Sequence, residues 1–138
     1  KAAVNYRIEA TNPGGHSSTP VRDNAIYELS DAPGRLRAYD FPLQMSDTTR
    51  AYFRGAGKAR GDAMGAAMQR IAADPTDKAA ETLLNTDKSY HSMLRTTCVA
   101  TLLDGGHANN ALPQRAGANI NCRIFPGVSA EAVRATLE

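Results

Sequence analysis

Apolar and polar residues alternate along the first ten positions of the chain. Val4, Tyr6 and Ile8 are apolar, and the residues between them are polar. Because successive side chains of a β-strand point to opposite faces of the sheet, this period of two predicts a half-buried strand over residues 2–10.

Two further segments have strand patterns. Residues 115–125 alternate again, with Ile120 and Cys122 on the apolar face and Asn119 and Asn121 on the polar face. Residues 97–103 are an almost continuous apolar run. These patterns predict two more strands in the second half of the chain.

Helical spacing of apolar residues follows the first strand and closes the chain. We expect Thr19 to cap the first helix, with Pro20 at its first position. Pro33 is expected to interrupt that helix near Asp31, since proline lacks the amide hydrogen. Ser129 is expected to cap a final helix.

The middle of the chain, about residues 46–96, is rich in alanine and methionine. Its patterns predict four helices, at 47–57, 62–73, 77–86 and 87–95. Met64, Met68 and Ile71 form an apolar stripe, which we interpret as core and not as a cofactor-binding surface.

The order strand, helix, helical insert, strand, strand, helix predicts an α+β fold. It matches five of the six elements of a split β-α-β (ferredoxin-like) unit, with the last strand truncated. We expect a two-layer sandwich with helices on one face of an antiparallel sheet and an open, polar second face. The prediction is one domain over residues 1–138, with the helical insert at about 46–96.

Composition excludes several classes of protein. The chain has 138 residues, with 16 Lys and Arg against 14 Asp and Glu. This balance argues against a nucleic-acid partner, and no stretch is long and apolar enough for a membrane helix. We expect a soluble protein, cytoplasmic or periplasmic/secreted, because two cysteines leave the compartment open. The start at Lys1 inside a strand pattern suggests an excised piece of a longer chain.

Residues that commonly bind metals do not form a recognisable metal site. None has the His-x-x-x-His, Cys-x-x-Cys or His-x-Asp spacing typical of zinc ligands. These residues are His16, His91, His107, Cys98 and Cys122. We therefore expect no metal site in this chain. Free buried thiols are the usual state of such cysteines, and a disulfide requires that their strands be neighbours.

Two residues have a pattern that suggests chemistry. His16 stands among glycines and hydroxyls without an orienting carboxylate, which argues against a nucleophilic triad. Next to the N-terminus of the predicted helix, a neutral imidazole could donate a hydrogen bond to an oxyanion. Arg123, on the polar face of its strand, could bind a carboxylate. The alternative for both residues is ordinary solvated surface.

Two motifs carry a resemblance to a known family. The first is Gly-Gly-His-Ser-Ser-Thr-Pro-Val-Arg-Asp-Asn-Ala-Ile at 14–26, and the second is Gly-Gly-His-Ala-Asn-Asn-Ala-Leu-Pro at 105–113. Ala-Asn-Ile-Asn-Cys-Arg-Ile-Phe-Pro-Gly follows at 118–127. The sequence resembles the dimerisation (lid) domain of the zinc-dependent exopeptidases that include carboxypeptidase G, aminoacylase, succinyl-diaminopimelate desuccinylase and carnosinase. The long insert is similar to the branch of carboxypeptidase S and N-acyl amino acid hydrolases.

The resemblance implies a role in hydrolysis of peptide or N-acyl amino acid amides. It implies a homodimer in which His16 enters the partner subunit's active site and stabilises the tetrahedral intermediate, together with Asn110. It implies that Arg123 binds the free carboxylate of the substrate. Zinc and a general-base glutamate are implied in a separate catalytic domain of the parent enzyme, so the isolated chain is expected to be inactive.

A different class of function is also compatible with the residues. The chain could be a non-catalytic α+β module that binds a small molecule, or a pure dimerisation module. Substitution of His16 or Arg123 would then leave peptide hydrolysis unchanged.

Overall fold

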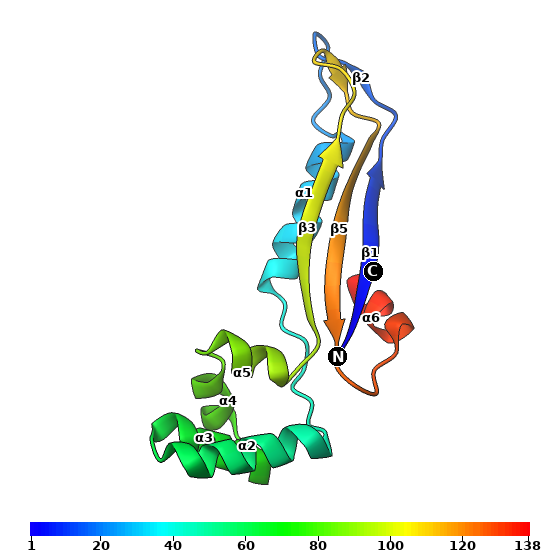
Figure 1. Cartoon of the computed structure of the whole chain (residues 1–138). Coiled ribbons are helices and arrows are strands. Elements are labelled where there is room, and N and C mark those ends of the chain that lie inside the picture. Colours follow the sequence, from blue (N-terminus) through cyan, green and yellow to red (C-terminus); the bar gives the residue numbers. More distant parts are fainter. The chain divides into compact units, whose positions relative to one another are not determined.

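The alternating segments form a three-stranded sheet in a computed structural model that describes residues 1–138 (Figure 1). The strand order is β1-β5-β3. Strand β1 (Ala2–Thr11) pairs antiparallel with β5 (Arg115–Ile124) along its whole length, from Ala2↔Ile124 to Thr11↔Arg115. Strand β3 (Thr97–Gly105) lies on the other side of β5 and runs opposite to it (Figure 1). The three predicted strands and the α+β class are confirmed.

The chain divides into two compact units. The first comprises Lys1–Asp40, Cys98–Ile124 and Val128–Glu138, and it holds the sheet with helices α1 (Ala25–Ala38) and α6 (Ala130–Leu137). The second comprises Phe41–Thr97 and Phe125–Gly127 and is helical. No helix in either unit is both long and apolar enough to cross a membrane.

Both helices of the first unit cover the same face of the sheet. The Tyr6 hydroxyl donates to the Ala130 carbonyl of α6 at 2.7 Å, and Ala116 lies beside Ile26 of α1 around Gly105. Tyr6 and Ala116 belong to the apolar face that the alternation predicts. The buried side chains of β5 are on that face, at Ala116, Ala118, Ile120, Cys122 and Ile124.

The opposite face is polar and open, as the sequence predicts. The Asn5 side chain accepts from Asn119 at 3.3 Å and from Asn121 at 2.9 Å, and Asn119 also donates to Thr101 at 2.7 Å. These bonds link all three strands across the open face.

The predicted start of the first helix is wrong. Helix α1 begins at Ala25, and the side chain of Asn24 accepts from the amides of Ile26 and Tyr27. Thr19 does not cap a helix and instead closes a turn, in which its amide donates to the His16 carbonyl at 3.1 Å. Asparagine is among the best N-cap residues, and the helix begins directly after Asn24.

The expected interruption of α1 at Pro33 is also wrong. The helix continues through Pro33 to Ala38. Proline removes one hydrogen bond of the helix, but Leu29, four residues earlier, is buried against the sheet with Ala25. Packing of this apolar face holds the helix together where local propensity does not.

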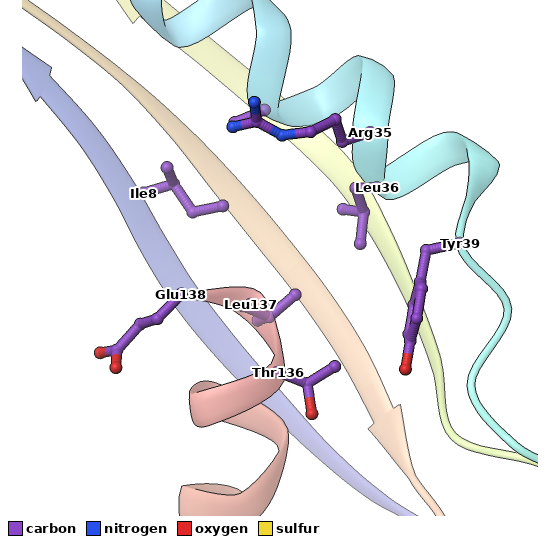
Figure 2. Close-up of a pocket in the computed structure, with 8 residues that line it drawn as sticks. Ile8, Arg35, Leu36, Tyr39, Thr136, Leu137 and Glu138 are labelled. Atoms are coloured by element: carbon purple, nitrogen blue, oxygen red, sulfur yellow. The ribbon is translucent and has the colours of Figure 1, made fainter.

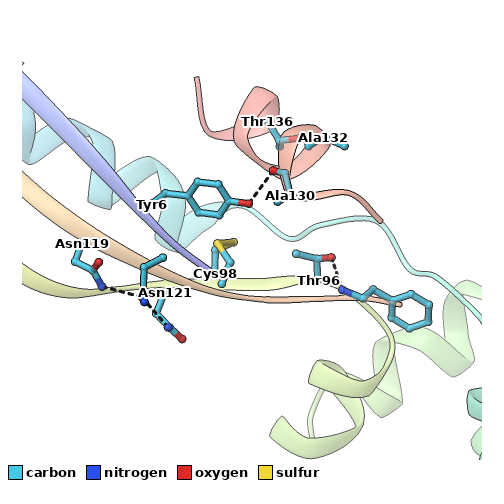
Figure 3. Close-up of a disulfide and its surroundings, with 11 residues drawn as sticks. Tyr6, Thr96, Cys98, Asn119, Asn121, Ala130, Ala132 and Thr136 are labelled. Carbon is cyan, nitrogen blue, oxygen red and sulfur yellow. Dashed lines mark hydrogen bonds between the residues drawn. A yellow bond between two sulfur atoms is a disulfide. The ribbon is translucent and has the colours of Figure 1, made fainter. Parts of the chain in front are cut away.

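Cys98 and Cys122 form a disulfide between β3 and β5, with Cα atoms 4.1 Å apart (Figure 3). The strands are neighbours, which is the condition that the sequence left open. The disulfide lies on the apolar face of the sheet, because Cys122 is fully buried. It links the edge strand β3 covalently to the central strand.

The four predicted helices of the insert are confirmed. They are α2 (Asp47–Arg60), α3 (Ala63–Ala73), α4 (Lys78–Leu84) and α5 (Lys88–Met93). Each is capped by a polar side chain, respectively that of Ser46, Asp62, Asp77 and Asp87. The core of this unit includes Met68 and Ile71 of the predicted stripe, against which the partly buried Met64 packs. Phe53, Leu84 and Leu94 complete the large buried side chains of this core.

Candidate functional site

Two short strands that the sequence patterns do not predict hold the glycine-rich segments together. Strand β2 (Gly15–His16) pairs antiparallel with β4 (Ala111–Leu112), with His16 opposite Ala111. Figure 1 shows this pair beyond the end of the main sheet at which β1 ends and β5 begins. At two residues each, these strands are too short for a periodic signal.

The turn before β2 needs a glycine at position 14. Gly14 has a φ of 80°, a conformation that other residues rarely adopt. A Cβ at this position would lie 2.6 Å from Gln114 Cγ and 3.1 Å from the Leu112 carbonyl oxygen. The Asn12 side chain accepts from the Gly14 amide at 3.0 Å, and Gln114 donates to the Pro13 carbonyl at 2.9 Å. The segment that carries His16 is therefore tied to the start of β5.

His16 and Asn110 lie side by side as a consequence. The Asn110 Nδ2 is 3.4 Å from the His16 Nε2. The Ser17 amide also donates to the Asn110 carbonyl at 2.9 Å, which fixes the two backbones relative to each other. Both side chains are exposed. The structure thus brings two of the three candidate residues together at one edge of the first unit.

The other ring nitrogen of His16 faces Ser18. The Ser18 hydroxyl is 2.7 Å from Nδ1, and the Ser18 amide donates to Nδ1 at 3.2 Å. The sequence patterns alone do not predict a role for Ser18. The hydroxyls next to the histidine in the Gly-His-Ser-Ser motif are the signal that could have identified it.

The location that was expected for His16 is wrong. The imidazole does not lie next to the N-terminus of a helix, because α1 begins nine residues later, at Ala25. The argument from the helix dipole therefore does not apply to His16. Its hydrogen-bond geometry comes instead from the turn formed by residues 16–19.

Arg123 lies far from the other two candidate residues. It is exposed near the end of β5, opposite Ala3, whereas the His16 pair lies beyond the start of that strand. Eight residues separate it from Arg115, and at about 3.3 Å per residue this distance is about 26 Å. One copy of the chain therefore cannot bring Arg123 and His16 to the same small molecule.

The open face also carries charges that neutralise each other. The Arg7 guanidinium donates to both oxygens of Asp104, at 2.9 and 3.0 Å. The hydrogen bond between Arg7 and Asp104 lowers the pKa of Asp104 and raises the pKa of Arg7. Arg115 pairs with Glu9 at 2.8 Å. No carboxylate of the chain forms such a pair with Arg123, so its guanidinium is available to an external anion.

Two hollows of the first unit are not lined by His16, Asn110 or Arg123, although His107 lines the first of them. A polar hollow of about 570 Å³ lies beside the start of β5. Its lining includes Asp104, which is paired with Arg7, and Arg115, which is paired with Glu9. A second hollow, of about 290 Å³, lies between α1 and α6 (Figure 2). Ile8, Leu36 and Leu137 contribute to its lining. The candidate site is therefore an exposed surface and not a closed pocket.

No group of three His, Cys, Asp or Glu side chains in the chain could hold a metal ion. Cys98 and Cys122, two of the five metal-binding candidates of the sequence, are joined in the disulfide. The residues of this chain therefore do not fit a zinc ion.

Comparison with known proteins identifies similar sequences and a similar fold. The profile of a peptidase dimerisation domain matches residues 1–138. "Probable carboxypeptidase S-like 2" from Dictyostelium discoideum is 29% identical over 129 residues, which are 94% of this chain and 24% of the relative. The chain thus spans about a quarter of the length of that relative.

A solved structure has a similar fold. The M20 family metallo-carboxypeptidase Sso-CP2 from Sulfolobus solfataricus aligns with a TM-score of 0.50 and 16% sequence identity. The alignment covers 98% of this chain and 37% of that structure.

Proposed function

The chain belongs to the M20 peptidase dimerisation domain family, and from this premise we propose that it is the dimerisation (lid) domain of a zinc-dependent exopeptidase. The parent enzyme would hydrolyse the amide bond of a peptide or an N-acyl amino acid. The proposal includes residues 1–138 as one dimerisation domain, with about 46–96 as its helical insert. The similarity to a carboxypeptidase S-like protein supports the choice of substrate class.

An exposed apolar surface supports self-association. Leu102 and Leu103 of β3 are 69% and 72% exposed. Between α1 and β3 lies a hollow of about 370 Å³, whose lining includes Pro33 and both leucines. Exposed apolar side chains next to an unpaired strand edge are typical of a protein interface. We assign this surface to a second copy of the chain.

The separation of the candidate residues supports a shared site. The carboxylate and the amide carbonyl of a C-terminal amino acid residue lie within about 5 Å of each other. The start of β5, beyond which His16 lies, is about 26 Å from Arg123 of the same copy. Both can contact one substrate only if His16 comes from one copy and Arg123 from the other. A dimer would meet this condition at two equivalent sites.

The side chains then have distinct roles in the proposed reaction. The His16 Nε2 and the Asn110 Nδ2 would donate hydrogen bonds to the oxygen that becomes negative when the amide carbonyl is attacked. Arg123 would bind the substrate carboxylate through two parallel hydrogen bonds. Zinc would belong to the catalytic domain of the parent enzyme, and no step is assigned to it here.

The 3.4 Å contact between His16 and Asn110 is the observation on which this function depends. The test uses the full-length enzyme that contains this chain, with His16→Ala and Arg123→Ala as variants. Loss of one oxyanion donor should lower kcat by about 10²–10³-fold. Loss of the carboxylate contact should lower kcat/KM by roughly tenfold to a hundredfold, mainly through KM.

His91→Ala, in α5 of the helical unit, is the matched control and should leave both constants unchanged. If His16→Ala and Arg123→Ala also leave hydrolysis unchanged, the chain is a non-catalytic binding or dimerisation module instead.

A further inference from the structure

The imidazole of His16 is held on one side by the residue two positions later. The Ser18 amide nitrogen is 3.2 Å from Nδ1, and the Ser18 hydroxyl oxygen is 2.7 Å from the same atom. The Thr19 amide donates to the His16 carbonyl at 3.1 Å, so these residues form one tight turn. The turn directs both polar groups of Ser18 at a single ring nitrogen.

This geometry determines which nitrogen carries the proton of the neutral ring. A backbone amide can only donate, so Nδ1 must accept and must lack a proton. The proton of the neutral imidazole is therefore on Nε2. Because the unprotonated Nδ1 can only accept hydrogen bonds, the Ser18 hydroxyl also donates to it.

The same assignment determines which groups at the contact between His16 and Asn110 can donate a hydrogen bond. The 3.4 Å contact from Asn110 Nδ2 is a hydrogen bond only when the proton is on Nδ1. With the proton on Nε2, which the shorter Ser18 contacts at Nδ1 favour, both atoms are donors. Two adjacent donors cannot satisfy each other. They can both donate to one external oxygen, which is the arrangement that a developing oxyanion requires.

We propose that Ser18 is a positioning residue, which holds His16 in the tautomer with the proton on Nε2 and directs that proton toward the substrate oxygen. The consequence for catalysis rests on the proposed function, whereas the tautomer itself does not. Ser18 does not touch the substrate in this proposal and acts only through the ring of His16.

The first test is spectroscopic and uses the 138-residue chain labelled with 15N-histidine. The chain has only three histidines, so His91→Gln and His107→Gln identify the His16 signals. At alkaline pH, where imidazole is neutral, the wild-type ring should show the proton on Nε2 alone. Ser18→Ala keeps the amide donor but lacks the hydroxyl, and it should increase the population with the proton on Nδ1.

Two variants control this measurement. Ser18→Thr retains a hydroxyl and should restore the wild-type spectrum, and Ser17→Ala removes the neighbouring hydroxyl and should have no effect. A wild-type ring with its proton on Nδ1, or identical His16 spectra for wild type and Ser18→Ala, would overturn the proposal.

The second test measures hydrolysis by the full-length enzyme. Ser18→Ala should lower kcat about two- to tenfold, the effect of one lost neutral hydrogen bond, with KM unchanged and activity restored by Ser18→Thr. If His16→Ala is inactive but Ser18→Ala retains full activity, the positioning role is wrong and the proposed function stands. If His16→Ala is fully active while Ser18→Ala still shifts the tautomer, the proposed function fails and the assignment of the proton stands.

Discussion

The Asn110 Nδ2 lies 3.4 Å from the His16 Nε2, although 94 positions separate the two residues in the sequence. Strands β2 and β4 bring them together, and the Ser17 amide bonds the Asn110 carbonyl at 2.9 Å. Arg123 lies near the far end of β5, about 26 Å from Arg115 at the start of that strand. His16 and Asn110 therefore form one group of candidate residues, and Arg123 stands apart from them.

Mixed dimers should recover activity from two impaired variants. His16→Ala dimers lack the oxyanion donor at both sites, and Arg123→Ala dimers lack the carboxylate contact at both. In a mixed dimer, one site receives an intact His16 and an intact Arg123. Random assortment of equal amounts should restore about a quarter of wild-type activity, because half of the dimers are mixed and each has one complete site.

The measurement is the hydrolysis rate after the two variant enzymes are unfolded and refolded together. Each variant refolded alone is the control. No recovery in the mixture would show that His16 and Arg123 of the same copy serve the same site.

Charge on the exposed surface of β3 should weaken dimerisation. Leu103 is 72% exposed, and burial of a leucine against a partner stabilises a complex by about 1.5–3 kcal/mol. Leu103→Glu should therefore raise the dimer dissociation constant more than about tenfold in sedimentation equilibrium. Leu83→Glu, on α4 of the helical unit, is the control and should leave it unchanged. Equal constants for wild type and Leu103→Glu would exclude this surface as the interface.

Reduction of the disulfide should destabilise the sheet. Cys98 and Cys122 close a loop with a separation of 24 residues. Loss of such a link costs about 3 kcal/mol of unfolding free energy, because the unfolded chain regains conformational freedom. Urea denaturation with and without reductant measures the difference, and the double variant Cys98→Ala, Cys122→Ala should not respond to reductant. Two reactive thiols in the unfolded, unreduced chain would contradict the pairing.

Two glycines of the same helix should respond in opposite ways to alanine. A Cβ on Gly57 would lie 2.6 Å from the Gly65 carbonyl oxygen of α3, so Gly57→Ala should cost about 1–3 kcal/mol. Gly55 has no atom within 4 Å of its Cβ position, and Gly55→Ala should stabilise α2 by about 0.5–1 kcal/mol. Urea denaturation of the two variants compares these values. Equal changes in unfolding free energy for the two variants would contradict the close packing of Gly57 against Gly65.

The helical unit should lose stability in acid. Arg60 and then the Gly65 amide lower the pKa of Asp62. The Ala80 amide and then Arg70 lower the pKa of Asp77. A lowered pKa means that the stabilisation is complete above the unfolded value, near 3.8, and is lost as the pH falls through the folded value.

The melting temperature should therefore fall steeply below about pH 4. The double variant Asp62→Asn, Asp77→Asn retains the capping amide oxygens but cannot titrate, so its melting temperature should fall less over the same range. Asp31→Asn, an exposed position of α1, is the control. A decline as steep in the double variant as in the wild type would contradict the role of these caps.

The sequence by itself determined the local structure and which face of each strand and helix is buried. Alternation placed Asn119 and Asn121 on the open face and Ile120 in the core, and Ser129 caps α6 as predicted. These features depend on side-chain periodicity and on hydrogen bonds within a few residues. Such information is present in a short window of sequence.

Only the tertiary structure decided which distant residues meet. It paired Cys98 with Cys122 and set Asn110 beside His16. It also placed the start of α1 at Ala25, after the Asn24 cap, and used Thr19 in the turn that positions the imidazole. Strand register and contacts between loops depend on the closure of long chain segments, whose outcome no local pattern of residues encodes.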